Sequence, residues 1–190
     1  MNIISIDLGT TNIKVSVYDS GLHPILTLSE AVQYDRNGDF VEFCCEDYFC
    51  SIAQLVRRAA KAGKEQDAQD VAEIVLTGQA ESLVLLDQGG LPVRPAISWM
   101  DMRSRRECED LSAIFPPDLC YRTTGQPELI PTWPITKMLW LRRHEPENFR
   151  KVDKYLLLKD YIVYRLCGRM AGDCSIYSFS HYYDIVNKCY

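Results

Sequence analysis

A short polar segment between two apolar runs is the first place in this sequence where residue types and spacing could do chemistry. The run "IISID" ends in Asp7, Gly9 follows, and Thr10 and Thr11 precede a second alternating run. A glycine lets a phosphate approach the backbone, and turn amides and threonine hydroxyls can donate to its oxygens. A carboxylate at the strand end can hold Mg²⁺ through water, and Lys14 can add a positive charge. The segment predicts a phosphate and magnesium site at a hairpin tip.

A tight turn whose threonines satisfy only their own backbone is the alternative explanation of this segment. The two common phosphate-binding fingerprints do not help to decide, since the chain contains neither GxxxxGK[ST] nor GxGxxG. The choice between a phosphate site and a simple turn therefore depends on what the later segments contain.

A second group of polar residues follows a predicted central strand. The run "VAEIVLTGQ" reads as a buried strand ending at Thr77 and Gly78, and Gln79 and Glu81 come just after it. Ligands of open α/β sheets collect beyond the carboxyl ends of the strands. A carboxylate close to an amide suits vicinal hydroxyl groups. We therefore expect Gln79 and Glu81 to contact a substrate, with solvated loop positions as the alternative.

Asp101 and Arg103 offer an acceptor and a set of donors to the same substrate. Both lie where a charged helix over residues 101–115 is expected to start, so capping and solvent exposure explain them equally well. The tryptophans are expected in the core, and Trp133 is the one that we place toward the site, because it precedes Pro134 in a loop.

The elements that must position these residues are short strands followed by alternating helices and strands. Such a pattern predicts a mixed sheet flanked by helices. "NGDF" predicts a tight hairpin, because Asn-Gly supplies the positive φ angles of a primed turn. The chain is expected to end without a clear helix after residue 173, which suggests a truncated piece of a longer protein. We expect strands over residues 3–7, 12–19, 23–34, 71–79 and 155–158, and two extended runs about Gly89 and Gly90. Helices are expected over 46–62 (stopped by Gly63), 101–115 (ended by Pro116 and Pro117), 134–145 (with Pro146 just past its end) and 159–168 (closed by Gly168).

Composition excludes several classes of function. The chain has 190 residues, 47% of them hydrophobic and 25% charged, with a formal net charge of −5. Without a polybasic stripe, neither nucleic acid nor a membrane is an expected partner. No secretory signal is recognised, so a cytoplasmic location is expected, and the eight scattered cysteines are predicted to be reduced structural thiols rather than a zinc site.

The opening stretch "IDLGTTN" resembles the first phosphate loop of the actin, hexokinase and Hsp70 superfamily. This resemblance implies a ribonuclease H-like (actin-like ATPase) α/β fold. The stretch is at least as similar to Hsp70 chaperones as to sugar kinases, so it leaves both classes open.

Four later stretches resemble the FGGY family of carbohydrate kinases, in the order of that family. They are "LTGQAESLVLLD", "AISWMDMRSRRE", "TTGQPELIPTWPITKMLWLRRHEPENF", and "YLLLKDYIVYRLCG" followed by "DCSIYS". A chaperone ATPase has no reason to carry all of them. The resemblance covers essentially the whole chain, and residues 1–190 are identified as an FGGY-type N-terminal sugar-binding and phosphate-loop domain.

The resemblance implies ATP and Mg²⁺ as cofactors and a small-molecule sugar or polyol as substrate. The family's catalytic aspartate and its C-terminal nucleotide domain are expected beyond residue 190, so this chain is expected to hold no catalytic residue and to be inactive alone. Ala80 and Glu81 stand where xylulose kinases typically have Met-His. Ala80 also replaces an Arg that glycerol kinases use, and Thr132 replaces their Tyr. By resemblance, Asp7 is carried over as a metal ligand, Thr10, Thr11, Asn12 and Lys14 as nucleotide contacts, and Gln79, Glu81 and Thr132 as substrate neighbours.

The predicted function is therefore the N-terminal half of an ATP-dependent sugar or polyol kinase, with a homodimer as a further expectation for the full-length enzyme. An Hsp70-like chaperone ATPase fragment and a non-catalytic sugar-binding module remain as alternatives. Peptide-stimulated ATP turnover would favour the first of these alternatives.

Overall fold

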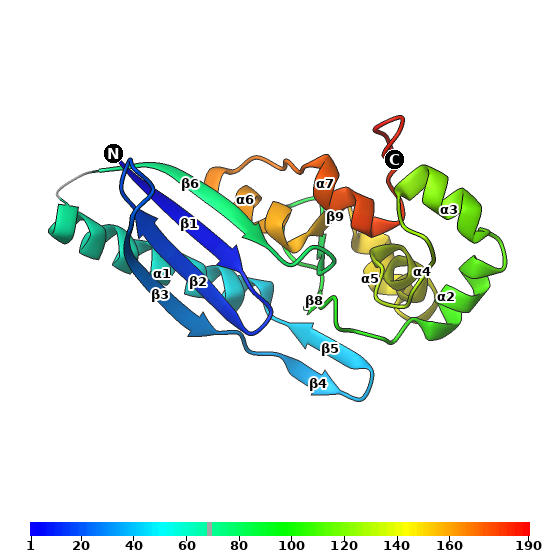
Figure 1. Cartoon of the computed structure of the whole chain (residues 1–190). Coiled ribbons are helices and arrows are strands. Elements are labelled where there is room, and N and C mark those ends of the chain that lie inside the picture. Colours follow the sequence, from blue (N-terminus) through cyan, green and yellow to red (C-terminus); the bar gives the residue numbers. More distant parts are fainter. Residues whose placement is uncertain (68–69) are drawn as a thin grey trace. The chain divides into compact units, whose positions relative to one another are not determined.

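A computed structural model describes residues 1–67 and 70–190 (Figure 1). The chain divides into two compact units. Unit 1 contains Met1–Gln33 and Cys44–Gln79, and unit 2 contains Tyr34–Phe43 and Ala80–Tyr190. None of the helices in the described ranges is both long enough and apolar enough to cross a membrane.

Unit 1 is a mixed four-stranded sheet with one long helix. Strands β1 and β2 and strands β2 and β3 pair antiparallel, whereas β1 and β6 pair parallel, giving the order β3-β2-β1-β6. The mixed sheet agrees with the prediction and with the expected fold class. The elements are β1 (Asn2–Leu8), β2 (Asn12–Tyr18), β3 (Pro24–Ala31), α1 (Cys45–Asp67) and β6 (Val71–Gly78).

The core of unit 1 lies between α1 and one face of this sheet, along which α1 runs in Figure 1. Alternate residues of β1 and β2 are buried because successive side chains of a strand point to opposite faces. The other face of the two strands carries mostly polar side chains, together with Ile3. The buried core positions include Ile4, Ile6, Leu8, Ile13, Val15 and Val17 from the strands and Ile52, Leu55 and Ala59 from α1.

Two predictions for unit 1 were wrong. Helix α1 does not stop at Gly63 but continues to Asp67. A Cβ atom at Gly63 would lie 3.0 Å from Val17 Cγ1, so this glycine allows close packing of helix on sheet. Strand β6 is not buried, because it is the edge of the sheet, and Ile74 and Val75 are 41% and 51% exposed.

Unit 2 combines an antiparallel five-stranded sheet, in the order β4-β5-β8-β7-β9, with several short helices. Leu83, Leu85 and Ile97 from the sheet pack with Leu141 from a helix in one of its hydrophobic core clusters. The strands are β4 (Asp35–Asn37), β5 (Phe40–Phe43), β7 (Leu83–Leu86), β8 (Ala96–Ile97) and β9 (Lys154–Leu157), and the helices are α2 (Arg105–Ser112), α3 (Pro117–Thr124), α4 (Pro134–His144), α5 (Pro146–Lys151), α6 (Leu158–Cys167), α7 (Cys174–Tyr177) and the 3₁₀ turn η1 (Ser178–Ser180).

The turn and helix-end residues of unit 2 predicted some of its element boundaries correctly and others wrongly. The Asn-Gly hairpin is confirmed, with Gly38 at φ +58°, and α6 ends at Gly168 in the left-handed region as predicted. The helix expected over residues 101–115 begins only at Arg105. Pro117 starts α3 instead of following a stop, as a first-turn proline can. The C-terminal segment contains α7, whose first amide groups are capped by Asp173.

Candidate active site

The tip of the β1–β2 hairpin is built around a position that has no room for a side chain. A Cβ atom at Gly9 would lie 2.3 Å from the Asn12 carbonyl oxygen. The Gly9 carbonyl accepts a hydrogen bond from the Tyr48 hydroxyl at 3.4 Å, and the Thr11 carbonyl accepts one from the Val32 amide at 2.9 Å. The tip is therefore held from α1 and from the segment after β3.

The end of β6 lies against the same tip. A Cβ atom at Gly78, which has φ +147°, would lie 2.4 Å from Leu8 Cβ, and the Gln79 amide donates to the Leu8 carbonyl at 3.1 Å. Gln79 therefore belongs to unit 1, whereas Glu81 belongs to unit 2, so the boundary between the two units falls between these two residues.

Asp7, Lys14 and Thr77 lie on one face of the sheet at its tip end. Asp7 is paired with Lys14 across the antiparallel ladder and with Thr77 across the parallel one. Directly opposed residues share a face, with Cβ atoms about 4.5–5.5 Å apart in an antiparallel pair. This face is the one opposite the buried Ile6 and Leu8. A carboxylate, an ammonium group and a hydroxyl are thus next to Gly9.

The side chains at the tip could bind a metal ion whose other ligands are phosphate oxygens and water. Within the described ranges, no three His, Cys, Asp or Glu side chains gather into a metal-binding group. Asp7 would therefore act as a single carboxylate. Mg²⁺ in nucleotide sites typically takes one or two carboxylates, phosphate oxygens and several waters, so the tip suits magnesium nucleotide rather than a bare metal ion. Thr10 and Asn12 are half-buried at the tip, and Thr11 is exposed.

Asp101 and Arg103 form a buried ion pair in unit 2. Asp101 is 0% exposed, and its carboxylate accepts hydrogen bonds from the Val41 amide at 2.6 Å and from the amide, Nε and Nη2 of Arg103 at 3.0, 2.9 and 2.7 Å. Arg103 Nη2 also donates to Glu42. The guanidinium carbon lies 4.2 Å from the ring centre of Phe40 and 4.8 Å from that of Trp140.

This pair is committed to the protein interior, and that corrects the expectation of direct substrate contact by Asp101 and Arg103. Neither residue caps α2 or faces water. Their hydrogen bonds tie the loop before α2 to β5, so their contribution is to hold the segments that carry other site residues. A buried charge needs this kind of pairing, because desolvation otherwise outweighs any gain.

Lys137 is the functional candidate that the sequence analysis missed. It lies in the first turns of α4, is 0% exposed, and donates from Nζ to the Ser98 carbonyl at 2.7 Å. Burial lowers the pKa of Lys137 to about 7, and the negative charges of Asp101 and Glu81 oppose that shift. The signal was present as an isolated lysine between the apolar residues of "PITKMLW", where only an interior partner could satisfy it.

Hydrogen bonds connect the segment that carries Glu81 and Ser82 to Thr132 and to Trp99 in unit 2. The Thr132 hydroxyl donates to the Glu81 carboxylate, and burial raises the pKa of Glu81, with the Lys137 charge and this hydrogen bond opposing the shift. The next residue, Ser82, is fully buried and accepts at Oγ from the Trp99 amide at 3.1 Å. The structure therefore brings together Glu81 and Thr132, which the sequence singled out, and adds Trp99.

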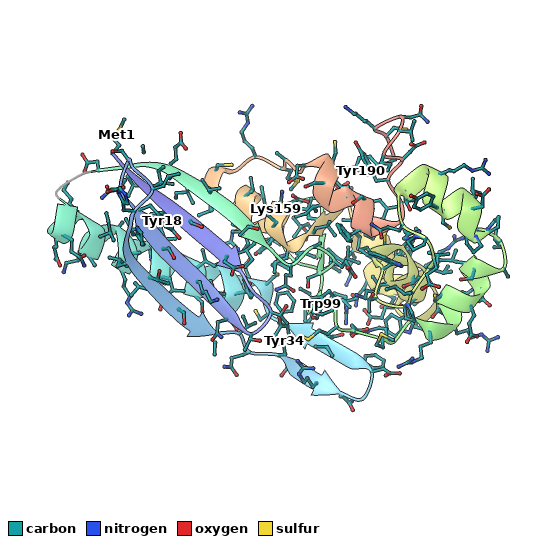
Figure 2. The ribbon with its side chains drawn as sticks, viewed as in Figure 1. Met1, Tyr18, Tyr34, Trp99, Lys159 and Tyr190 are labelled. Carbon is teal, nitrogen blue, oxygen red and sulfur yellow. The ribbon has the colours of Figure 1, made fainter. Side chains whose placement is uncertain are left out.

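The burial of two tryptophans differs from what the sequence predicted. Trp133 is only 6% exposed, its indole NH donates to the Glu128 carbonyl at 3.1 Å, and its ring packs 5.1 Å from that of His181. It is a core residue, because the loop before Pro134 turns its side chain inward. Trp99 is 36% exposed in the turn after β8 and is labelled in Figure 2.

Comparison with known families identifies the family of this chain. The family model described as "FGGY family of carbohydrate kinases, N-terminal domain" matches residues 2–190. The chain belongs to the FGGY family of carbohydrate kinases. This confirms the resemblance found in the sequence, and it decides the choice that "IDLGTTN" left open between chaperone and kinase.

Among curated proteins, the xylulose kinase of Escherichia coli (strain K12) is 34% identical over 187 residues, which are 97% of this chain and 37% of that protein. The xylulose kinase of Bacillus subtilis (strain 168) is 31% identical over 175 residues, 87% of this chain and 33% of that protein. The chain thus spans about a third of the length of these relatives.

Solved structures confirm the fold. The xylulose kinase of Rhodospirillum rubrum has a TM-score of 0.92 at 22% identity, covering 98% of this chain and 38% of its own. The glycerol kinase of Plasmodium falciparum, solved with ADP, has a TM-score of 0.91 at 22% identity, covering 100% of this chain and 39% of its own. Both likenesses support the actin-like ATPase fold expected from the sequence.

Proposed function

We propose that this chain is the N-terminal, sugar-binding and phosphate-loop part of a kinase that transfers the γ-phosphate of ATP to a hydroxyl group of a sugar or polyol. The observation that carries the proposal is the family match over residues 2–190. The Escherichia coli and Bacillus subtilis relatives are named xylulose kinases, so a ketose is the first substrate to test.

Unit 1 supplies the phosphate end in this proposal. Backbone amides at the Gly9 tip and the side chains of Thr10, Thr11 and Asn12 would contact phosphate oxygens, and Lys14 would add a positive charge. Asp7 would hold Mg²⁺ through water. Magnesium held there would supply neutralisation of the phosphate charge. The absence of a side chain at Gly9 supports these assignments, because phosphate can approach the backbone closely there.

Unit 2 supplies the sugar end. Glu81 would accept hydrogen bonds from sugar hydroxyls, Thr132 would orient its carboxylate, and Trp99 would offer a partly exposed ring face. Asp101 and Arg103 are assigned as supports of this site, and Trp133 is not assigned to it. Gln79 is assigned to the phosphate tip through its backbone contact with Leu8. A carboxylate at this position favours neutral sugars and polyols over sugar acids, by charge repulsion.

The general base and the adenine-binding domain are assigned to parts of the full-length protein outside residues 1–190. Phosphoryl transfer requires an acceptor hydroxyl in line with the γ-phosphate and a group that takes its proton. We therefore expect the isolated chain of 190 residues to phosphorylate no sugar. Transfer of phosphate by this isolated chain would contradict the assignment.

The direct test is an ADP-release assay of the full-length protein that carries this chain, with Mg-ATP and a panel of ketoses, aldonic acids and polyols. One neutral sugar or polyol is expected to stimulate turnover. Glu81→Gln should raise the KM for it by about tenfold or more, since hydrogen bonds to charged groups contribute about 1.5–3 kcal/mol. The exposed Glu147→Gln should leave it unchanged.

Two other outcomes would redirect the assignment. ATP turnover that a peptide stimulates and sugars do not would favour a chaperone-like activity. Saturable sugar binding without phosphorylation would favour a non-catalytic sugar-binding module. A homodimer of the full-length protein stays a prediction, which light scattering would test.

A further inference from the structure

Lys137 is a fully buried cation that lies among charged groups from several elements of unit 2. Asp101 and Arg103 come from the loop before α2, and Glu81 from the segment before β7. Glu42 on β5 reaches this cluster through its hydrogen bond with Arg103. Burying a lysine is costly, so a folded protein retains one where its charge or its hydrogen bonds have a use.

The two arginines of this cluster are paired with Asp101 and Glu42, not with Glu81. Arg103 is committed to Asp101, to which it donates through its amide, Nε and Nη2, and its Nη2 also reaches Glu42. Glu42 in turn accepts from Arg94. The negative charge of Glu81 is therefore left outside the arginine network, and Lys137 is the cation whose field acts on it.

The hydrogen bond of Lys137 also leads to the segment that carries Glu81. Its Nζ donates to the Ser98 carbonyl at 2.7 Å, and the next amide, that of Trp99, donates to Ser82 Oγ at 3.1 Å. Ser82 follows Glu81 directly. Directly before Lys137 on α4, the Thr136 hydroxyl donates to the Pro131 carbonyl at 2.9 Å, next to Thr132. Lys137 thus lies at the junction of the segments that carry Glu81, Trp99 and Thr132.

We propose that Lys137 is a positioning residue of the sugar site: its buried ammonium group holds the Ser98–Trp99 turn and supplies the counter-charge that keeps the Glu81 carboxylate ionised and oriented. This inference rests on the proposed function for the role of Glu81. It adds a pH-dependent element to the site, because the group that positions Glu81 gains and loses its proton near neutral pH.

Two consequences follow from the linkage between protonation and binding. The protonated form of Lys137 is the form that binds sugar well, so the affinity for sugar falls as the pH rises through about 7. By reciprocity, bound sugar stabilises the proton on Lys137. A lysine that only fills space in the core would show neither effect.

The first experiment measures the proton directly and needs no substrate. In the full-length protein labelled with ¹³C at lysine Cε, one resonance is expected to titrate near pH 7 and to vanish in Lys137→Met. Glu81→Gln should move its midpoint down by about one pH unit, because an opposite charge has been removed. The exposed Glu147→Gln should not move it. An unchanged midpoint in Glu81→Gln would overturn the proposal.

The second experiment measures the KM for sugar against pH, with D-xylulose as the first probe and otherwise the sugar that the panel identifies. In the wild type the KM should rise from pH 6 to pH 8.5. Lys137→Met should raise the KM about tenfold at pH 6, with kcat changed less than twofold, and should flatten the profile. Lys137→Arg, which stays charged, should flatten the profile at a lower KM. A wild-type pH profile retained by Lys137→Met would overturn the proposal.

The two experiments separate this proposal from the proposed function. If no sugar is phosphorylated, the proposed function fails, while the titration still decides whether Lys137 and Glu81 are coupled. If a sugar is phosphorylated and Glu81→Gln leaves the lysine midpoint in place, the kinase assignment stands and the role of Lys137 fails.

Discussion

The two units of this chain build their candidate sites in opposite ways. In unit 1 the candidate site depends on two residues without side chains, since there is no space for a Cβ atom at Gly9 or Gly78. In unit 2 it depends on charged groups that are present but buried, with Asp101 and Lys137 both 0% exposed. A change that adds atoms should therefore damage unit 1, whereas a change that removes a charge should damage unit 2.

The largest expected effect lies in unit 2. Asp101→Ala should lower the free energy of unfolding by about 3–5 kcal/mol, because the buried Arg103 loses its bonds to the Asp101 carboxylate and keeps only Glu42 as a counter-charge. The comparison variant is Asp39→Ala, whose partner Arg105 lies at the surface, with side chains 49% and 56% exposed. It should cost less than about 1 kcal/mol. Urea unfolding measures both, and equal losses would show that burial does not separate the two pairs.

In unit 1 the corresponding change adds a methyl group at Gly9. Gly9→Ala should reduce kcat/KM for Mg-ATP in the full-length protein by about a hundredfold, because the tip must shift to relieve a 2.3 Å contact with the Asn12 carbonyl, and displacements of about 1 Å cost that much. Gly89→Ala is the control, since its new Cβ would meet a movable Asp87 side chain at 3.2 Å. A fully active Gly9→Ala protein would remove the steric argument for the tip.

The pH dependence of stability should also reflect unit 2. The pKa of Lys137 is about 7 in the folded chain and about 10.4 in an unfolded one. Between these values the unfolded chain binds more protons, so this group makes the free energy of unfolding rise with pH, by about 1 kcal/mol per pH unit, and contributes no slope below pH 7. Urea unfolding at pH 7 and pH 9 should show this increase in the wild type, and Lys137→Met should lack it.

The smallest expected effect concerns the packing of α1 on its sheet. Gly63→Ala should gain helix propensity but lose about 1 kcal/mol overall, because the new methyl group meets Val17 Cγ1 at 3.0 Å and Val17 is 0% exposed. In a Val17→Ala background the same change should become neutral or stabilising. Denaturant unfolding of the four proteins gives the coupling directly, and additive changes would show that the contact has no cost.

The hairpin tip was predictable from sequence because its determinants are neighbours in the chain. Asp7, Gly9 and Thr10 lie within one turn, and their residue types alone suggested phosphate. The Asn37–Gly38 hairpin was predictable for the same reason, since the positive φ of a glycine is a local property. The mixed sheet of unit 1 followed from these signals together with the alternation of strands and helices.

The support of the sugar site could not be predicted in the same way. Lys137 and Ser98 are separated by 39 positions, and Asp101 and Val41 by 60. A single sequence does not show which distant charges compensate one another, and so it placed Asp101 and Arg103 at the start of a surface helix. Trp133 was placed wrongly for a related reason, because its partner His181 is far away in the chain.

Strand β6 leads through Gly78 to the tip of the β1–β2 hairpin, and it is also the edge of its sheet, with Ile74 and Val75 substantially exposed. Unpaired edges with apolar side chains act as templates for other strands. When this chain is prepared by itself, its solubility should therefore fail before its folding does. A charge introduced at Val75, on the face away from the core, would be the first change to try when concentrated samples are needed.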